Sequence, residues 1–157
     1  MPDATKGPFP FKGKGENDWS IPSLRGRIEH LQRKRELTLR QMKSLIDDYE
    51  NTFDNKLPAY LVLHKTANGQ YLRWRMSGVK QRYFSIAEDE IGKSFLLSQS
   101  RPVRGVLMDI EKNRLQLNLL HGEVFYQIKS LRKLISHLLD LREFTKTSPV
   151  NLCESNI

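Results

Sequence analysis

Residues 60–86 read YLVLHKTANGQYLRWRMSGVKQRYFSI, and this segment separates two much longer segments that repeat with helical spacing. It contains three runs with the composition of β-strands, at 60–65, 70–76 and 79–86. Asn68-Gly69 and Ser77-Gly78 stand between these runs, and such pairs are typical of β-hairpin turns. We therefore predict a three-stranded antiparallel meander at the centre of the chain.

The segment before the meander, residues 23–51, repeats its seam positions at alternating spacings of four and three residues. This heptad seam predicts a long helix that buries one face. Ser20 offers an N-cap and Pro22 suits the first helical turn, so both mark the start of this helix. The seam consists of Leu24, Ile28, Leu31, Arg35, Thr38, Met42, Leu45 and Tyr49, of which the central two are polar.

The segment after the meander keeps the same spacing from residue 103 to residue 144. Gly105 and Gly122 each weaken such a helix by ~1 kcal/mol relative to alanine, but nothing in the segment forces it to end. His121 falls on the seam, where we expect a partly buried core histidine. The seam consists of Val103, Leu107, Ile110, Arg114, Leu117, His121, Val124, Ile128, Leu131, Ile135, Leu138 and Arg142.

These patterns predict an α+β fold that is mostly helical. We expect two long antiparallel helices in a coiled-coil-like hairpin, with the small three-stranded antiparallel β-meander inserted between them in the sequence. Residues 85–88, SIAE, have the form of a capping box, which predicts a short helix over 87–97. We expect one domain over residues 19–146, a flexible basic arm at 1–18 and a flexible tail at 147–157.

The second long segment has more apolar residues than one seam can bury. Six of them lie off the seam, namely Leu115, Leu119, Leu120, Phe125, Leu134 and Leu139. Apolar surface of this extent on a helix is normally covered by a partner. We therefore expect a homodimer that is built mainly through residues 103–144.

The 157 residues carry a net charge of +8, with a pI near 9.7, and this charge is unevenly distributed. Residues 1–86 contain 16 lysines and arginines against 9 acidic residues, whereas residues 87–157 contain 10 against 9. A basic first half beside a nearly neutral second half favours a surface that faces a polyanion. Charge that serves only solubility is the alternative interpretation.

The sequence shows no signal for export or membrane insertion. Its single cysteine, Cys153, excludes an intrachain disulfide framework and fits a reducing compartment. No apolar run reaches the ~18–20 residues of a membrane span, and residues 1–20 lack the apolar core of a signal peptide. We expect a cytoplasmic protein with no membrane partner.

The segment 71–84, YLRWRMSGVKQRYF, concentrates four aromatic and four cationic side chains without one acidic residue. A two-residue turn at 77–78 places like charges opposite one another across the two strands, Arg75 with Lys80 and Arg73 with Arg82. Each such pair destabilises a sheet by about a few tenths of a kcal/mol. The segment therefore favours a surface that is made for an anionic partner.

Alternation along the two strands separates their side chains onto two faces. The first face packs on the helices and collects Leu72, Trp74, Met76, Val79 and Tyr83. The second face is the candidate nucleic-acid site, where aromatic rings can stack on bases and arginines can bind phosphates. It collects Tyr71, Arg73, Arg75, Lys80, Arg82 and Phe84. A docking surface for an acidic protein and a merely solvated face remain as alternatives.

The N-terminal arm adds Lys12 and Lys14 to the candidate site, because a basic arm can follow a phosphate backbone. No pair of histidine or cysteine residues has the spacing of a zinc site, and no spacing brings a nucleophile and a base together. The sequence therefore predicts no metal, no cofactor and no enzymatic activity.

Two short motifs, FKGKG at residues 11–15 and YLRWR at residues 71–75, resemble a pattern in a small protein family. That family is encoded on integrating conjugative elements and related plasmids. The resemblance implies a bacterial mobile element, where the handling of DNA is a common task, and it supplies no catalytic or binding residues. The expected function is a non-enzymatic nucleic-acid-binding accessory protein, with DNA favoured over RNA. The alternative is a coiled-coil adaptor whose basic β-ribbon docks an acidic protein partner.

Overall fold

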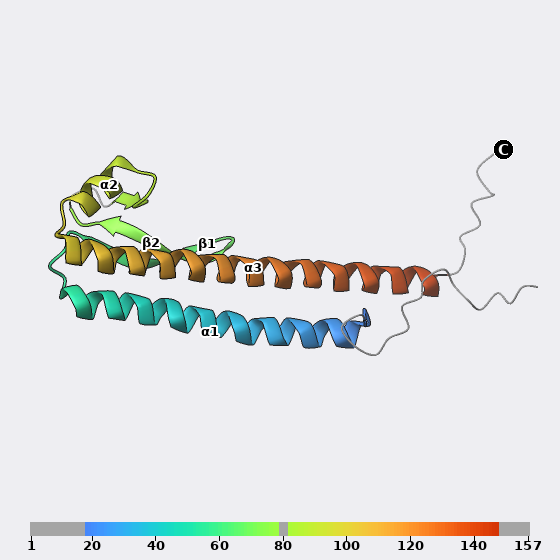
Figure 1. The fold of residues 1–157 in the computed structure, drawn as a ribbon. Coiled ribbons are helices and arrows are strands. Elements are labelled where there is room, and N and C mark those ends of the chain that lie inside the picture. The colour runs from blue at the N-terminus through green and yellow to red at the C-terminus, as the bar shows by residue number, and fades with distance from the viewer. Residues whose placement is uncertain (1–17, 79–81, 148–157) are drawn as a thin grey trace, which may run out of the picture. The chain divides into compact units, whose positions relative to one another are not determined.

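The computed structural model describes residues 18–78 and 82–147 (Figure 1). Along these residues the elements follow in the order α1 (Ile21–Phe53), β1 (Ala59–Thr66), β2 (Gly69–Met76), β3 (Arg82–Phe84), α2 (Glu90–Leu97) and α3 (Arg101–Lys146). The strands form one antiparallel sheet in the order β1-β2-β3. The mostly helical α+β class with a small three-stranded antiparallel sheet is therefore confirmed. Most of the predicted arm and tail lies outside the described residues.

Two compact units make up the chain. The first consists of residues 1–30 with residues 128–157, and the second consists of residues 31–127. The helices α1 and α3 contribute to both units. In the first unit Leu24 of α1 and Ile128 of α3 are buried, and the second unit contains the whole sheet and α2.

The two heptad seams are the buried faces of α1 and α3, as predicted. The buried seam residues are Leu24, Ile28, Thr38, Met42, Leu45 and Tyr49 in α1, and Leu107, Ile110, His121, Val124, Ile128 and Ile135 in α3. The hydroxyl of Thr38 donates to the carbonyl oxygen of Lys34 at 2.9 Å, so this polar member of the seam is satisfied. Among the described residues, no helix combines the length and the apolar character that crossing a membrane requires.

Both ends of α1 have a local cause. The hydroxyl oxygen of Ser20 accepts a hydrogen bond from the Ser23 N–H at 3.4 Å, so Ser20 caps the helix as predicted. At the other end, Asp54 and Asn55 adopt φ values of 50° and 54°. Short polar side chains tolerate this left-handed conformation better than others do, and it turns the chain out of the helix toward β1.

Trp74 lies at the centre of the core of the second unit and is 0% exposed. Tyr49 from α1 meets its ring edge-on, with 5.3 Å between the centroids, and Phe84 from β3 stacks on it at 6.3 Å. Burial raises the pKa of Tyr49 to about 12, and its hydroxyl donates to the carbonyl oxygen of Ala59. The prediction that Trp74 faces the helices is confirmed.

β1 and β2 pair over their whole length, and the last pair is Thr66 opposite Gly69. The turn consists of Ala67 and Asn68, one residue earlier than predicted. Gly69 adopts a φ of +117°, and a Cβ atom added to it would lie 3.0 Å from Nε2 of His121. Both the conformation and the close approach therefore favour glycine at this position.

The predicted register between the second and third strands is wrong. Arg75 pairs with Tyr83 rather than with Lys80. Met76 pairs with Arg82, and a two-residue turn at residues 77–78 does not fit this register. Because the register differs from the predicted one by an odd number of residues, the side chains of β3 exchange faces.

Phe84 therefore lies in the core and Tyr83 lies on the other face, contrary to the prediction for both. Phe84 is 7% exposed, and its ring contacts that of Phe95 in α2 with 6.1 Å between the centroids. Tyr83 is 38% exposed. The physical reason is that Phe84 buries an all-carbon ring beside Trp74, whereas Tyr83 keeps its hydroxyl where it can form a hydrogen bond.

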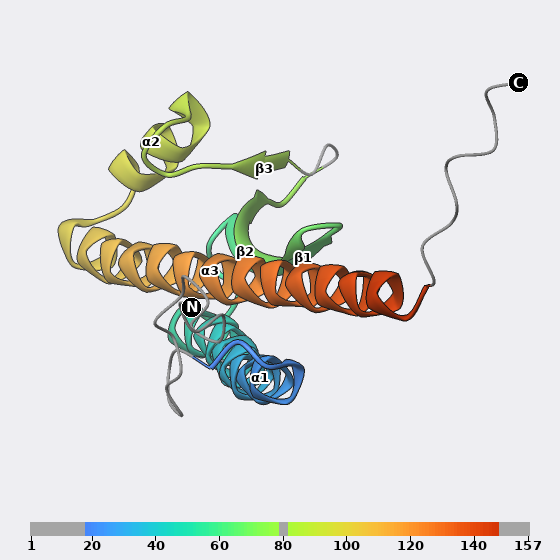
Figure 2. The same ribbon diagram turned by 90° about the vertical axis from the view of Figure 1, so that its right-hand side faces the viewer.

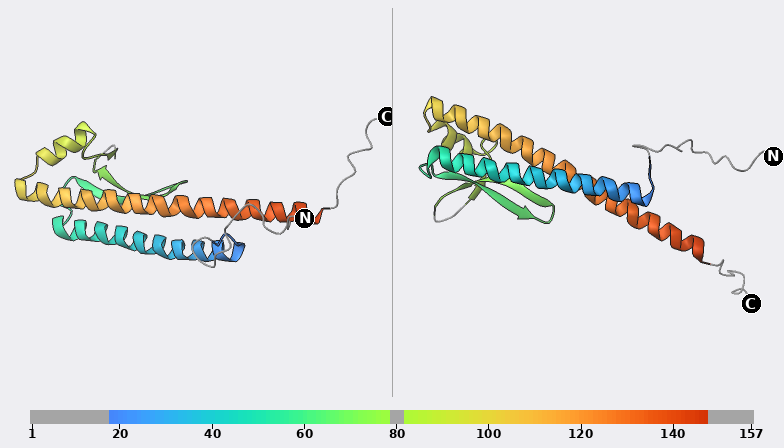
Figure 3. Two further views of the ribbon diagram at one scale, coloured as in Figure 1. Left: turned by 45° about the vertical axis from the view of Figure 1, so that its right-hand side comes forward. Right: turned by 90° about the horizontal axis from the view of Figure 1, so that it is seen from below.

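β2 extends beyond its pairing with β3, and α3 covers the edge that remains (Figure 3). Asn118 of α3 accepts from the Leu72 N–H at 2.8 Å and donates to the Leu72 carbonyl oxygen at 2.9 Å. Arg114 donates to the same oxygen at 3.0 Å, and Nε2 of His121 accepts from the Gln70 N–H at 3.2 Å. Side chains of one helix thus replace a neighbouring strand.

β3 leads into α2, which begins at Glu90 rather than at the predicted residue 87 (Figure 2). Asp89 precedes it, and the carboxylate of Asp89 accepts from the Ser85 N–H at 2.7 Å. A Cβ atom added to Gly92 would lie 2.0 Å from the Ser85 carbonyl oxygen. Only glycine allows this close approach, which holds α2 against the end of β3 and puts Phe95 beside Phe84.

Candidate nucleic-acid interface

We use the term open face for the side of the sheet opposite the core. The core side carries the buried residues Leu61, Leu72, Trp74 and Phe84, and strand alternation turns the residues between them the other way. The open face consists of Tyr60, Val62 and His64 from β1, Tyr71, Arg73 and Arg75 from β2, and Tyr83 from β3. Of these side chains, two are exposed and the others are half-buried.

Tyr83 holds two arginines together on the open face. The guanidinium carbon of Arg73 lies 4.5 Å from the centroid of the Tyr83 ring, and that of Arg75 lies 5.5 Å from it. The register explains this geometry, because Tyr83 is directly opposite Arg75 and is the diagonal neighbour of Arg73. The electron-rich face of the ring attracts both cations and offsets part of their mutual repulsion.

His64, on the opposite edge strand of the sheet, orients the Tyr83 ring. Its Nδ1 atom lies 2.9 Å from the Tyr83 hydroxyl oxygen, and the two rings meet at 65° with 4.8 Å between their centroids. β2 lies between the strands that carry these two residues. The contact therefore crosses the whole width of the open face and restricts the ring that the arginines use.

The open face is positively charged. It carries Arg73 and Arg75 beside His64, and the described strand residues contain no aspartate or glutamate. Within residues 18–78 and 82–147, neither arginine of the open face forms an ion pair, and Nε of Arg75 is buried without a hydrogen-bond partner. A guanidinium has five N–H donors, so both groups retain the capacity to bind an anion.

The structure brings three of the predicted site residues together on the open face, namely Tyr71, Arg73 and Arg75. The hydroxyl of Tyr71 donates to the carbonyl oxygen of Asn68 at 2.8 Å, which fixes the ring near the hairpin turn. Arg82 is exposed but lies opposite Met76, so its side chain starts on the core side of the sheet.

Phe84 was expected on the open face, and this expectation is wrong. Its ring is buried beside Trp74, so it is not available to stack on a base. Three further predicted residues lie outside the described part of the chain, namely Lys12, Lys14 and Lys80.

Sequence reasoning missed Tyr60, His64 and Tyr83 as members of this surface. A signal for the first two was available, because Tyr60 and His64 alternate in the sequence with the apolar Leu61 and Leu63. For Tyr83 the sequence offered no sufficient signal, since its face depends on the number of residues between the two strands.

A scan against protein-family models, a search of the curated proteins and a search of the solved structures each found no match for this chain. The candidate interface presents two arginines, one histidine and three tyrosine rings on one surface of the sheet. Groups of these kinds can bind phosphates and stack on bases.

Proposed function

We propose that this chain is a non-enzymatic nucleic-acid-binding accessory protein that contacts its ligand through the open face. The observation that supports this most is the pairing of Arg73 and Arg75 on the single ring of Tyr83. The Tyr83 ring offsets only part of the repulsion between these two cations, and an anion between them offsets more of it. A face with a purely structural role has no need for this charge.

The groups of the open face suit the two parts of a nucleotide. A guanidinium above an aromatic ring still has N–H donors in its own plane, and phosphate oxygens accept such donors strongly. Tyr83 offers an exposed ring on which a base can stack, at about 1–3 kcal/mol per base. The Tyr71 ring is half-buried and contacts His121 edge-on, so only its remaining surface is available for stacking. Phosphate binding by arginine carries no base sequence, so this surface fits binding that is largely independent of sequence.

We favour DNA over RNA as the ligand and a role in replication, maintenance or transfer of a bacterial mobile element. The support is the resemblance of the motifs at residues 11–15 and 71–75, together with the basic first half of the chain. These processes take place in the cytoplasm, a compartment that a chain with one cysteine fits.

We also propose that α1 and α3 pack as an antiparallel hairpin. The support lies in the second unit, where Met42 and Tyr49 of α1 belong to the same core cluster as Leu107 and Ile110 of α3. In the first unit, seam residues of both helices are likewise buried.

A homodimer through residues 103–144 is a further part of the proposal. Met108, Leu115, Leu119 and Tyr126 are all exposed. Their spacings of seven, four and seven residues bring them onto one line along α3, because a helix turns about 100° per residue. A second copy offers the same apolar stripe, and a two-fold interface matches a surface with itself.

A coiled-coil adaptor that docks an acidic protein through the same open face is the second candidate. The observation in its favour is the absence of acidic residues from the described strands, which leaves Arg73 and Arg75 without an ion pair. Like a phosphate, a carboxylate accepts strong hydrogen bonds from a guanidinium.

A titration at two salt concentrations separates the two candidates. Labelled single-stranded DNA, duplex DNA and RNA of one sequence are titrated at about 50 mM and about 200 mM salt, between which phosphate binding weakens steeply. The double variant Arg73→Gln/Arg75→Gln should lose most of the affinity. The control Arg25→Gln/Arg40→Gln removes the same charge from exposed positions of α1 and should lose little. Wild-type protein without measurable affinity for any nucleic acid at ~50 mM salt refutes the proposed function.

A further inference from the structure

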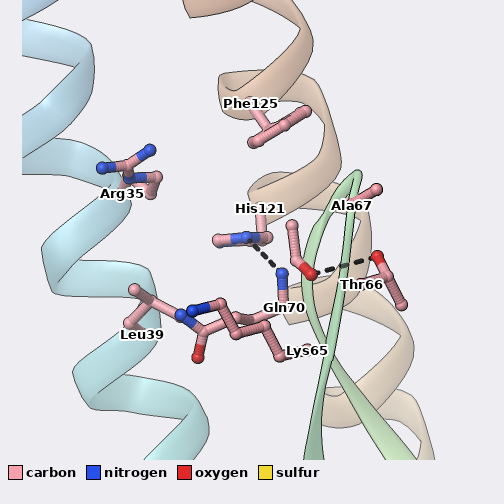
Figure 4. A pocket seen from close by; sticks show the side chains of 9 residues that line it. Arg35, Leu39, Lys65, Thr66, Ala67, Gln70, His121 and Phe125 are labelled. Atoms are coloured by element: carbon pink, nitrogen blue, oxygen red, sulfur yellow. Dashed lines mark hydrogen bonds between the residues drawn. The ribbon is translucent and has the colours of Figure 1, made fainter.

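A pocket of about 300 Å³ lies within the second unit, beside the turn of the β1–β2 hairpin (Figure 4). Three elements contribute to it: Arg35 comes from α1, Lys65 and Gln70 come from the hairpin, and His121 comes from α3. Lys65 and Gln70 are opposite each other in the register and belong to the core side of the sheet. However, Tyr71 of the open face also contacts His121 of the pocket edge-on, with 5.9 Å between the ring centroids.

His121 is the buried polar group of this pocket and is 1% exposed. Burial and the positive charge of Arg35 lower the pKa of His121, so its imidazole is neutral near pH 7. Nε2 accepts the hydrogen bond from the Gln70 N–H (Figure 4). A neutral imidazole that accepts at Nε2 carries its proton on Nδ1. Within the described residues, this buried Nδ1 has no hydrogen-bond partner.

The charge around this donor has one sign. Arg35 and Lys65 add two cations to the lining, and none of the lining residues is acidic. Within the described parts of the chain, neither cation forms an ion pair. A buried N–H without an acceptor is costly. The half-buried Arg35 and the exposed Lys65 add positive charge beside this donor, which favours an anion in the pocket.

We propose that this pocket binds a phosphate monoester group, either as free phosphate or as the terminal phosphate of a nucleic acid. Two cations and one neutral N–H donor on three separate elements suit a tetrahedral dianion, which accepts hydrogen bonds in several directions. Phe125 and Leu39 form an apolar part of the pocket wall. The group that carries the phosphate can pack against these two side chains.

A terminal phosphate suits this pocket better than an internal phosphodiester does. An internal diester carries one negative charge and has a chain on both sides, whereas a monoester carries up to two charges and has one free end. Binding of free phosphate stands independently of the proposed function. Binding of a nucleic-acid end rests on that function, because the open face would hold the rest of the strand.

Calorimetry with inorganic phosphate tests the pocket directly, with chloride used to match the ionic strength. We expect saturable binding at one site. Arg35→Gln and Lys65→Gln should each weaken it by about tenfold or more, as expected for the loss of one hydrogen bond to a charged group. Arg40→Gln and Lys43→Gln are matched controls at exposed positions of α1 outside the pocket, and they should bind as the wild type does. No binding, or equal binding by all five proteins, overturns the proposal.

The imidazole nitrogen resonances of His121 give a second measurement that does not depend on the variants. Phosphate should shift the Nδ1–H signal and slow the exchange of this proton with solvent, because the anion becomes its acceptor. A His121 spectrum that stays unchanged at saturating phosphate contradicts the assigned site.

Two oligonucleotides that differ only in a terminal phosphate distinguish the two sources of the group. Tighter binding of the phosphorylated form, with the difference lost in Arg35→Gln, identifies a nucleic-acid end. Equal binding of both forms identifies free phosphate as the ligand of the pocket. The variant Arg73→Gln/Arg75→Gln should keep its binding of inorganic phosphate, so failure of the open-face function and failure of the pocket are separable.

Discussion

Trp74 donates its indole N–H to Glu111, with 2.6 Å between Nε1 and Oε2, and both side chains are buried. The same carboxylate binds Arg114 through both oxygens, at 2.7 Å and 2.8 Å. Arg114 in turn donates to the carbonyl oxygen of Leu72 on β2. One buried carboxylate thus connects the central aromatic ring of the core to the helix that covers the edge of β2.

Replacement of Glu111 tests this connection. Glu111→Ala should lower the free energy of unfolding by about 3–5 kcal/mol, because it leaves the Arg114 charge and the Trp74 N–H without their acceptor. Glu111→Gln retains one acceptor and should cost less than the alanine variant does. Urea unfolding measures both, and Glu123→Ala, at an exposed position of the same helix, should change the value by no more than about 0.5 kcal/mol. Equal effects at the two positions contradict the role assigned to Glu111.

Asn118 imitates a β-strand partner for Leu72, and hydrogen exchange can detect this role. Asn118→Ala should lower the stability by about 1–3 kcal/mol, since it leaves a backbone N–H and part of a carbonyl group unsatisfied. The amide of Leu72 should lose protection from exchange. The amide of Gln70, which donates its hydrogen bond to His121, should retain its protection. Asn113→Ala is the exposed control on α3. Unchanged protection of the Leu72 amide contradicts the capping role.

The pKa of His121, which burial and Arg35 lower, predicts a dependence of stability on pH. The unfolded chain binds a proton at the ordinary value of about 6.5, whereas the folded state resists protonation, so acid favours unfolding. The free energy of unfolding should therefore be retained above pH ~6.5 and should fall as the pH drops from there toward the folded pKa.

Chemical denaturation between pH 4.5 and about 8 in buffers without phosphate measures this dependence, with a slope from His121 of at most about 1.4 kcal/mol per pH unit. In His121→Gln this part of the slope should be absent. His137→Gln, at an exposed position of α3, should retain it. The same slope in all three proteins contradicts a contribution from His121.

Variants of the open face should separate phosphate contacts from stacking. Arg73→Gln and Arg75→Gln should each weaken binding to all sequences alike and reduce the log–log salt slope by about 0.9 for duplex or about 0.7 for single strands. Tyr83→Ala should lower affinity for single strands and also loosen both arginines. Tyr83→Phe keeps the ring but removes the hydrogen bond to His64, so it should retain most of the affinity. If none of these four substitutions changes the affinity, the open face is excluded as the binding site.

Sedimentation tests the apolar stripe on α3. The wild type should be a dimer at tens of micromolar, and Leu119→Glu should shift it to a monomer, because Leu119 is 63% exposed and lies in the middle of the stripe. Leu37→Glu is the matched control, since Leu37 is a leucine of α1 that is 55% exposed. A wild-type monomer, or equal behaviour of the two variants, removes the support for the homodimer.

The sequence by itself determined the elements that repeat a local pattern. The heptad spacing of 23–51 and 103–144 identified the buried faces of α1 and α3, and the strand alternation of residues 70–76 identified Trp74 as a core residue. These features follow from the chain over many consecutive residues, because a helix or a strand presents its residues at a fixed angle whatever lies next to it.

Only the tertiary structure decided which residues of β3 face the core and what covers the edge of β2. A change of one residue between two strands reverses every side chain of the second strand, and local propensity does not specify that number. Burial of Phe84 between Trp74 and Phe95 selects the register of β3, and this register brings Tyr83 to Arg73 and Arg75 on the open face. The contacts of α3 with β2 join residues 37 to 51 positions apart in the chain. No sequence periodicity connects such residues, because their meeting depends on how the whole core packs.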